Sequence, residues 1–173
     1  GEPQATAAVA DVPSGRKSIA TVDHLYQCVE TLPEARELGR LLLEKQEVCF
    51  DTETTSLDTH SAELIGMSFA FETGKAYYVP VPQERDGAQE WVAAFQPFFE
   101  SESVGKIGQN LKYDIGVLLN YGVEVRGPLF YTMNAHYLRR PDYRHKMDIL
   151  SVTVLEYTNI SYERVVGKKT QNA

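Results

Sequence analysis

Two short acidic motifs in this chain could carry chemistry. The first, Phe50-Asp51-Thr52-Glu53-Thr54, places two acids two residues apart at the end of an apolar run. Alternate residues of a strand share a face, so the carboxylates of Asp51 and Glu53 would project to the same side of a sheet. Two like charges held close together repel, and a divalent metal ion relieves that repulsion because hard cations prefer oxygen ligands. A strand end that runs into a polar turn would explain the same residues without a metal.

The second motif, Gly108-Gln109-Asn110-Leu111-Lys112-Tyr113-Asp114, runs from a strand end into a helix. Asn110 is a favoured N-cap residue, and it stands four positions before Asp114, hence on the same helical face. Asp114 falls in the first turn, where the helix dipole favours an anion, so a purely structural role would also explain it. Lys112 and Tyr113 offer the cation and aromatic ring that bind a backbone phosphate and stack on a base. An ordinary solvated lysine and a half-buried tyrosine are the alternative.

Both motifs follow strands, and mixed α/β sheets build their sites at strand ends. We therefore expect Asp51 and Asp114 to come together, although they are far apart in the sequence. Three carboxylates at one edge would suit two divalent ions ~3.5–4 Å apart, one activating a water molecule and one stabilising the leaving oxygen. Because the acids repel one another, replacing either one is expected to leave the stability of the folded domain unchanged or to raise it.

At greater length the motifs resemble those of a known family. Residues 50–58 (Phe-Asp-Thr-Glu-Thr-x-Ser-Leu-Asp) and 104–114 (Val-Gly-Lys-Ile-Gly-Gln-Asn-Leu-Lys-Tyr-Asp) resemble the first two exonuclease motifs of the bacterial DNA polymerase I family. Arg144-His145-x-Met147-Asp148 resembles the segment that this family carries after its fifth strand. The resemblance spans roughly residues 20–169. It implies an α/β, ribonuclease-H-like (DnaQ-like exonuclease) fold, with a mixed central sheet of about five strands flanked by helices.

The resemblance also implies roles for single residues. Asp51, Glu53 and Asp114 would be the catalytic metal ligands, and Glu53 would also orient the attacking water. Leu57 would wedge against the terminal base, although a core position would equally explain this leucine. Arg144, which an exposed surface cation would also explain, would contact DNA. The residues implied to line the single-strand path are Thr54, Leu57, Gln109, Asn110, Lys112, Tyr113 and Arg144.

The implied activity is 3′-5′ exonuclease proofreading. Two divalent metal ions, Mg²⁺ or Mn²⁺, would serve hydrolysis of the 3′-terminal phosphodiester of single-stranded DNA, by in-line attack of water without a covalent intermediate. Frayed or mismatched ends would be preferred, because unpairing costs less there. The implied partners are the single-stranded 3′ end of DNA and the remainder of a polymerase chain in cis. We expect a cytoplasmic monomer with no membrane partner.

Two departures from the family pattern stand out. The family's third motif, Tyr-x-x-x-Asp, lies some tens of residues beyond its Gly-Lys-Lys stretch and does not occur in this chain. We therefore expect the metal ions to be weakly bound or absent here, and the chain by itself to be weak or inactive. The second departure is Tyr131, which stands where the family usually has Asp. That Asp caps a helix, a role that Thr132 would partly assume.

Two other functions remain open. One is a non-catalytic domain that keeps the fold only to brace a polymerase, and the other is an RNA exonuclease of the ribonuclease D type. Degenerate bracing domains usually lose their carboxylates, whereas all three acids are present here. The flanking residues Gln-Asn-Leu-Lys-Tyr-Asp favour the polymerase over ribonuclease D.

Alternating and helical patterns of apolar residues predict the elements that position these motifs. Strands are predicted at 24–30, 48–50, 64–71, 76–81, 104–108 and 125–130. Helices are predicted from Pro33 through Leu42 and at 89–99, 111–121, 132–139 and 147–157. Residues 1–18 are small, polar and Pro-containing, which is typical of a linker or tail, and 19–173 would form the exonuclease domain without its C-terminal part.

Composition is compatible with this reading. The 173 residues fit one domain, and no apolar run approaches the roughly 18 residues of a membrane span. The net charge of −7 argues against a broad duplex-binding surface, but not against a site that grips a short single strand through metal ions. Cys28 and Cys49 are expected to be buried, reduced thiols rather than a disulfide, which favours a cytoplasmic setting.

Overall fold

The computed structural model describes residues 15–161 and 164 of the chain. The chain divides into two compact units, one of residues 24–143 and one that combines the residues up to Asp23 with those from Arg144 onward. The larger unit contains both acidic motifs, so its elements position the candidate site.

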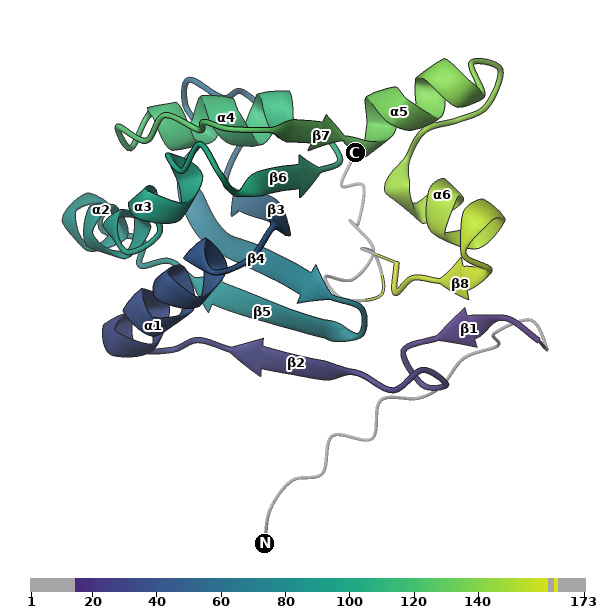
Figure 1. The fold of residues 1–173 in the computed structure, drawn as a ribbon, viewed down its shortest axis with the longest axis horizontal. Helices are drawn as coiled ribbons and strands as arrows, with labels where there is room; N and C mark the ends of the chain where they lie inside the picture. The colour runs from purple at the N-terminus through teal and green to yellow at the C-terminus, as the bar shows by residue number, and fades with distance from the viewer. Residues whose placement is uncertain (1–14, 162–163, 165–173) are drawn as a thin grey trace, which may run out of the picture. The chain divides into compact units, whose positions relative to one another are not determined.

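A six-stranded mixed sheet forms the larger unit, with the strands in the order β2-β5-β4-β3-β6-β7 (Figure 1). The antiparallel pairs are β3–β4 and β4–β5, and the other neighbours pair in parallel. The described sheet thus has one strand more than the expected five or so. Its strands are β2 (Leu25–Cys28), β3 (Glu47–Thr54), β4 (Leu64–Glu72), β5 (Lys75–Pro80), β6 (Gly105–Gly108) and β7 (Leu129–Tyr131).

The first helix of this unit starts where local chemistry favours a start. A capping box opens the first helix, because Thr31 accepts a hydrogen bond from the Glu34 backbone and the Glu34 side chain accepts one in return. Pro33 lies in the first turn, where a missing N–H costs nothing. The helices are α1 (Leu32–Leu43), α2 (Arg85–Ala93), α3 (Gln96–Phe99), α4 (Leu111–Leu119) and α5 (Thr132–Arg139).

Prolines explain two differences from the predicted elements. The single helix predicted at 89–99 is in fact two, α2 and α3, because Pro97 would clash with the preceding turn inside a continuous helix. At its actual place, in the first turn of α3, the same proline is tolerated. The last strand begins at Leu129 rather than at 125, after Gly127 with φ +83° and Pro128, which has no N–H for a sheet ladder.

The core lies on one face of the sheet. In β3 the side chains of Val48, Phe50 and Thr52 are buried on this face, against residues of the helices. Phe50 meets Phe99 edge to face with ring centroids 5.2 Å apart. The odd-numbered residues of β3 point to the opposite, more open face, so the alternation places Asp51 and Glu53 away from the aromatic core.

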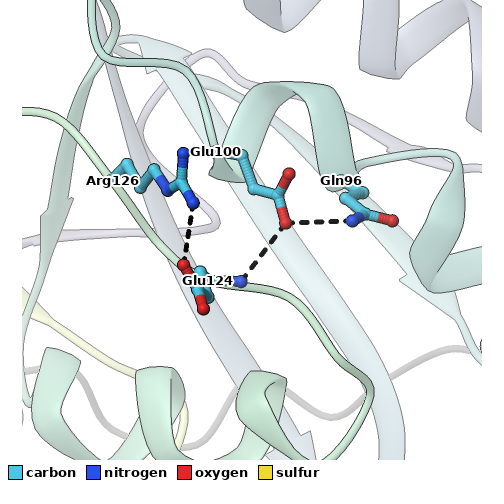
Figure 2. A network of polar contacts seen from close by, with 4 residues as sticks. All are labelled: Gln96, Glu100, Glu124 and Arg126. Carbon is cyan, nitrogen blue, oxygen red and sulfur yellow. Dashed lines mark hydrogen bonds and ion pairs between the residues drawn. The ribbon is translucent and has the colours of Figure 1, made fainter.

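Polar contacts tie the end of α3 to the segment that leads into β7. Glu100 Oε1 accepts hydrogen bonds from Gln96 Nε2 at 2.9 Å and from the Glu124 backbone N at 3.4 Å, and Arg126 pairs with the Glu124 carboxylate at 2.8 Å (Figure 2). Beneath them the fully buried Lys106 donates to two backbone carbonyls, and burial lowers the pKa of its ammonium group to about 8. These contacts hold β6, the strand that leads into the second motif.

The described part of the smaller unit includes a parallel pair of two-residue strands and a helix. Strand β1 (Lys17–Ser18) pairs with β8 (Tyr157–Thr158). Helix α6 (Met147–Val154) ends three residues before its predicted end, because Glu156 adopts a left-handed φ of +54° that no helix can continue. Of the expected linker, residues 1–14 lie outside the described part of the chain and Lys17–Ser18 form β1.

The cysteines differ from expectation in one respect. Cys28 and Cys49 are both free thiols, as expected, but both are exposed rather than buried. Cys28 lies on the edge strand β2, and Cys49 lies on the open face of β3, which the apolar sequence around it did not reveal. Within the described residues, no helix is long and apolar enough to cross a membrane.

Candidate active site

The two acidic motifs meet where β6 ends. β6 pairs with β3 in parallel as far as Ile107 opposite Cys49, and the chain then turns into α4. A side chain on Gly108 would overlap Leu111 and would approach the Phe50 carbonyl oxygen at 3.2 Å. Only glycine therefore permits this close turn, which sets the first turn of α4 beside the carboxyl end of β3.

Asp114, in that first turn, is bonded directly to the first motif. Its side chain is buried, with the residue 2% exposed, and its Oδ1 accepts hydrogen bonds from the Thr52 backbone N at 3.0 Å and from Thr52 Oγ1 at 2.7 Å. Burial raises the pKa of the Asp114 carboxyl, and the two bonds from Thr52 oppose that rise. The helix dipole alone therefore does not account for the position of Asp114, because the N–H and hydroxyl of Thr52 hold its carboxylate.

Asp51 lies within β3 rather than after a strand, and Asp114 lies near it because Asp114 is bonded to the next residue, Thr52. The pKa of the Asp51 carboxyl is raised to about 7, first by burial, then by the negative charge of Asp114, then by that of Glu53. The pKa of the Cys49 thiol, on the same face as Asp51, is raised by partial burial and then by Asp51 and Asp114. Negative charge is therefore concentrated at this strand end, and a divalent cation would relieve the repulsion between these acids.

Glu53 stands at the exposed end of β3, opposite Gly66 of β4. Because Gly66 has no side chain, the ring and hydroxyl of Tyr78 lie over its backbone, in space that any Cβ would occupy. The pKa of the Tyr78 hydroxyl is raised by partial burial and then by the charge of Glu53. Sequence reasoning missed Tyr78 as a neighbour of the site, because only the pairing of β4 with β5 brings it there.

One stripe of α4 holds the loop that follows the first motif. Tyr113, Gly116 and Asn120 share a helical face by their spacing. The Tyr113 hydroxyl donates to the Ser56 carbonyl oxygen in the loop and is also bonded to Thr54 Oγ1 at the end of β3. The lack of a side chain on Gly116 admits Thr59, and Asn120 Nδ2 donates to the Thr59 carbonyl oxygen at 2.6 Å. The loop is thus fastened to the helix at three points.

Leu57 projects from this fastened loop and is 95% exposed. That exposure excludes a core position for this leucine, the alternative that the sequence left open. A large apolar side chain held in water by a tied loop is a candidate contact for an apolar surface such as a nucleobase.

We expect Tyr113→Phe to loosen this loop without disturbing the rest of the fold. The change removes the hydroxyl that joins α4 to Thr54, and a lost hydrogen bond of this kind costs about 0.5–1.5 kcal/mol. Amide hydrogen exchange should accelerate several-fold in residues 55–61. Tyr26→Phe, at an exposed tyrosine on β2, is the control and should leave exchange in the loop unchanged. Equal exchange in both variants would contradict the fastening role.

Comparison with known proteins decides the family. The sequence model of a family described as "3'-5' exonuclease" matches residues 26–173. The chain belongs to this 3′-5′ exonuclease family. It is 38% identical over 136 residues to DNA polymerase I of Pseudomonas aeruginosa, an alignment that covers 73% of this chain and 15% of that relative. The chain is therefore an exonuclease domain of the kind found in DNA polymerase I, and it spans a small part of the relative's length.

Solved structures share the fold. Brucella melitensis NrnC, determined with bound Mg²⁺, has a TM-score of 0.61 and 16% identity, with 87% of this chain and 70% of that chain covered. The ribonuclease D of Trypanosoma brucei, determined in complex with RNA U12, has a TM-score of 0.66 and 14% identity, with 83% and 51% covered. At these identities the likeness establishes the ribonuclease-H-like fold of the exonuclease domain and nothing more.

The other residues expected along the single-strand path of this exonuclease domain are placed differently from one another. Lys112 is exposed on α4, and Gln109 is half-buried, its Oε1 accepting a hydrogen bond from the Thr132 hydroxyl. Asn110 occupies the N-cap position of α4, as predicted, although its side chain makes no cap bond. Arg144 is exposed and belongs to the smaller unit, which is described by itself.

Thr132 does not take over the cap of α5. That helix has Tyr131 at its N-cap position, without a side-chain bond, and the hydroxyl of Thr132 is directed instead to the Gly108 carbonyl at 3.3 Å and to Gln109. Gly108 ends β6, the strand that pairs with β7 immediately before α5. Thr132 consequently fastens α5 to the turn between β6 and α4.

The acids of the exonuclease domain fit a divalent metal in their chemistry. All three candidates offer hard carboxylate oxygens, and Asp51 and Asp114 already share one electrostatic environment. As they stand, no three His, Cys, Asp or Glu side chains within residues 15–161 converge closely enough to hold an ion by themselves. Asp51 and Asp114 are thus the candidate ligands that the fold brings nearest to each other through Thr52.

Proposed function

We propose that this domain removes nucleotides from the 3′ end of single-stranded DNA, as the proofreading exonuclease of a DNA polymerase. The observation that supports the proposal most strongly is the meeting of Asp51 and Asp114 at the end of β3, with Glu53 two residues further along the same face. Burial raises the pKa of both Asp51 and Asp114, and acids with raised pKa at a strand end are the kind of site that metal-dependent hydrolysis uses.

Asp51, Glu53 and Asp114 would hold two divalent ions, Mg²⁺ or Mn²⁺. When bound, such ions activate water and stabilise the oxygen that leaves the phosphate. Buried Asp114 and partly buried Asp51 would give the site its fixed ligands. Glu53, which is exposed at the strand end, would orient the attacking water in line with the departing nucleotide oxygen.

Residues around the acids would hold the DNA end. Leu57 would pack against the terminal base, and Lys112, exposed on α4, would face a backbone phosphate. The negative net charge of the chain disfavours a broad grip on duplex DNA, so a paired end would first have to fray. Mismatched ends fray more readily, and this difference would give the domain its preference for errors.

The finer points of this function are proposals as well. We propose that the domain acts as a monomer in the cytoplasm, in cis with the rest of a polymerase. An RNA exonuclease of the ribonuclease D type is the second candidate, because the solved ribonuclease D shares the fold at low identity. The exonuclease family match and the polymerase relative favour DNA.

The test is shortening of 5′-labelled DNA and RNA oligonucleotides by the natural full-length protein, with and without Mg²⁺. We expect shortening of single-stranded DNA from the 3′ end only when Mg²⁺ is present, and faster shortening of mismatched than of paired ends. Faster degradation of RNA would favour the second candidate. No degradation of either substrate would favour the non-catalytic bracing domain.

Leu57→Ala should raise KM for single-stranded DNA about 10-fold in this assay, because burying a leucine side chain against a base contributes roughly 1.5–3 kcal/mol. Leu25→Ala is the matched control, since this leucine is also exposed but lies on β2, three strands away from β3. An unchanged KM for Leu57→Ala would remove this leucine from the substrate path.

A further inference from the structure

Thr52 separates the two acids of the first motif, yet its side chain lies on the other side of the strand from theirs. It is 7% exposed and faces the core with Val48 and Phe50, whereas Asp51 and Glu53 point to the open face. Nothing in the chemistry of the acids accounts for a buried hydroxyl at this position. Buried polar groups need partners, and the partner of this one is the Asp114 carboxylate.

The backbone of Thr52 meets the same partner for a reason that lies in the sheet. The Gln46 carbonyl accepts a hydrogen bond from the Gly105 N–H, so the even-numbered residues of β3 direct their backbone groups toward β6. The pairing of the two strands stops at Cys49 opposite Ile107. The Thr52 N–H therefore points to the side of β3 where β6 no longer runs and offers no acceptor. Asp114 Oδ1 accepts its hydrogen bond instead, at 3.0 Å.

We propose that Thr52 is the positioning residue for Asp114. Both of its donors, the backbone N–H and the hydroxyl, bind one oxygen, Oδ1, so the two bonds together fix the plane of the carboxylate and the direction of its second oxygen. This inference rests on the proposed role of Asp114 as a metal ligand. Removing a group that orients a metal ligand in this way commonly lowers metal affinity or activity roughly 10- to 100-fold.

The hydroxyl can be removed without changing the shape of the side chain. Thr52→Val keeps the β-branched outline and the stiff χ1 of a strand residue and leaves the backbone N–H in place. Thr52→Ser keeps the hydroxyl and loses only a methyl group. If positioning is the role of Thr52, the serine variant retains function and the valine variant does not, although serine fits the apolar surroundings less well.

The experiment measures Mn²⁺ binding by calorimetry and single-strand exonuclease kinetics, with the natural full-length protein and its Thr52→Val and Thr52→Ser variants. For Thr52→Val we expect Mn²⁺ affinity and kcat each to fall by about 10-fold or more, with KM for DNA unchanged. For Thr52→Ser both should stay within about 3-fold of the original protein. Thr153→Val, which removes an exposed hydroxyl bonded to the Ile149 carbonyl in α6, is the control and should change neither.

The outcomes separate this inference from the proposed function. If all variants bind Mn²⁺ equally and degrade DNA equally, the positioning role is overturned and the exonuclease assignment stands. If the unaltered protein neither binds Mn²⁺ at millimolar concentration nor degrades DNA, both are overturned. If Thr52→Val folds poorly, Thr52→Ser alone tests the positioning role. A serine variant that folds but loses as much Mn²⁺ affinity as a variant without a metal ligand would contradict that role.

Discussion

Replacing Asp51 with asparagine is expected to abolish exonuclease activity and to stabilise the metal-free fold. The activity of the full-length protein should fall by a factor of about 10³ or more, because loss of a metal ligand removes several kcal/mol of transition-state stabilisation. The stability should move the other way. Asparagine has nearly the shape of aspartate, but it carries no charge that burial and Asp114 would penalise.

The sign of the stability effect follows from the raised pKa. Asp51 titrates near 3.8 in an unfolded chain and at about 7 in the fold. Between these values the folded state binds more protons, so its stability falls as pH rises through this window. Asp51→Asn should therefore gain about 1–3 kcal/mol over the original chain at pH 8, a figure reduced for the partial exposure of this carboxyl, and nothing at pH 4.

Urea unfolding from pH 4 to pH 8 without divalent ions measures this difference. Adding Mn²⁺ should reverse it at pH 8, because an ion that binds the folded state stabilises only the protein that keeps its ligand. A variant that loses activity and also loses stability at pH 8 would show that Asp51 is a structural residue. A variant that stays active would remove Asp51 from the catalytic site.

Asp114→Ala is expected to abolish activity and, unlike the change at Asp51, to destabilise the domain. Alanine leaves the Thr52 N–H and hydroxyl buried without an acceptor, and the loss should amount to about 2–4 kcal/mol of unfolding free energy. From charge repulsion alone, the sequence predicts no loss of stability at either acid. The two hydrogen bonds reverse that expectation for Asp114.

Asp114→Asn is the matched variant for this prediction. Its amide oxygen can still accept both bonds from Thr52, so the fold should keep most of its stability while the charge that would bind a metal is lost. Thermal unfolding and the single-strand assay together measure the contrast. If the alanine and asparagine variants are equally stable, the bonds to Thr52 contribute nothing, and if the asparagine variant stays active, Asp114 is not a metal ligand.

The local elements and the choice of candidate acids follow from the sequence by itself. Alternation of apolar and polar residues within 48–54 predicts which side chains of β3 share a face, and the Asp51–Glu53 spacing places both acids on one side of the sheet. The apolar runs that lead into each motif also predict that Asp51 and Asp114 lie at the same edge of the sheet. These properties depend on residues close together in the chain, so their pattern is visible in one sequence.

Only the tertiary structure decided what each of these residues contacts. The bonds from Thr52 to Asp114 exist because β6 ends before it reaches Thr52. Tyr78 lies near Glu53 because Gly66 has no side chain. Cys49 is exposed because it lies on the open face of the sheet. Each depends on strands or helices that are distant in sequence, and a residue type carries no record of which distant element will pack against it. The sequence therefore determined which acids are candidates for catalysis, and tertiary packing determined that Thr52 holds Asp114 and that burial, then the charges of Asp114 and Glu53, raise the pKa of Asp51.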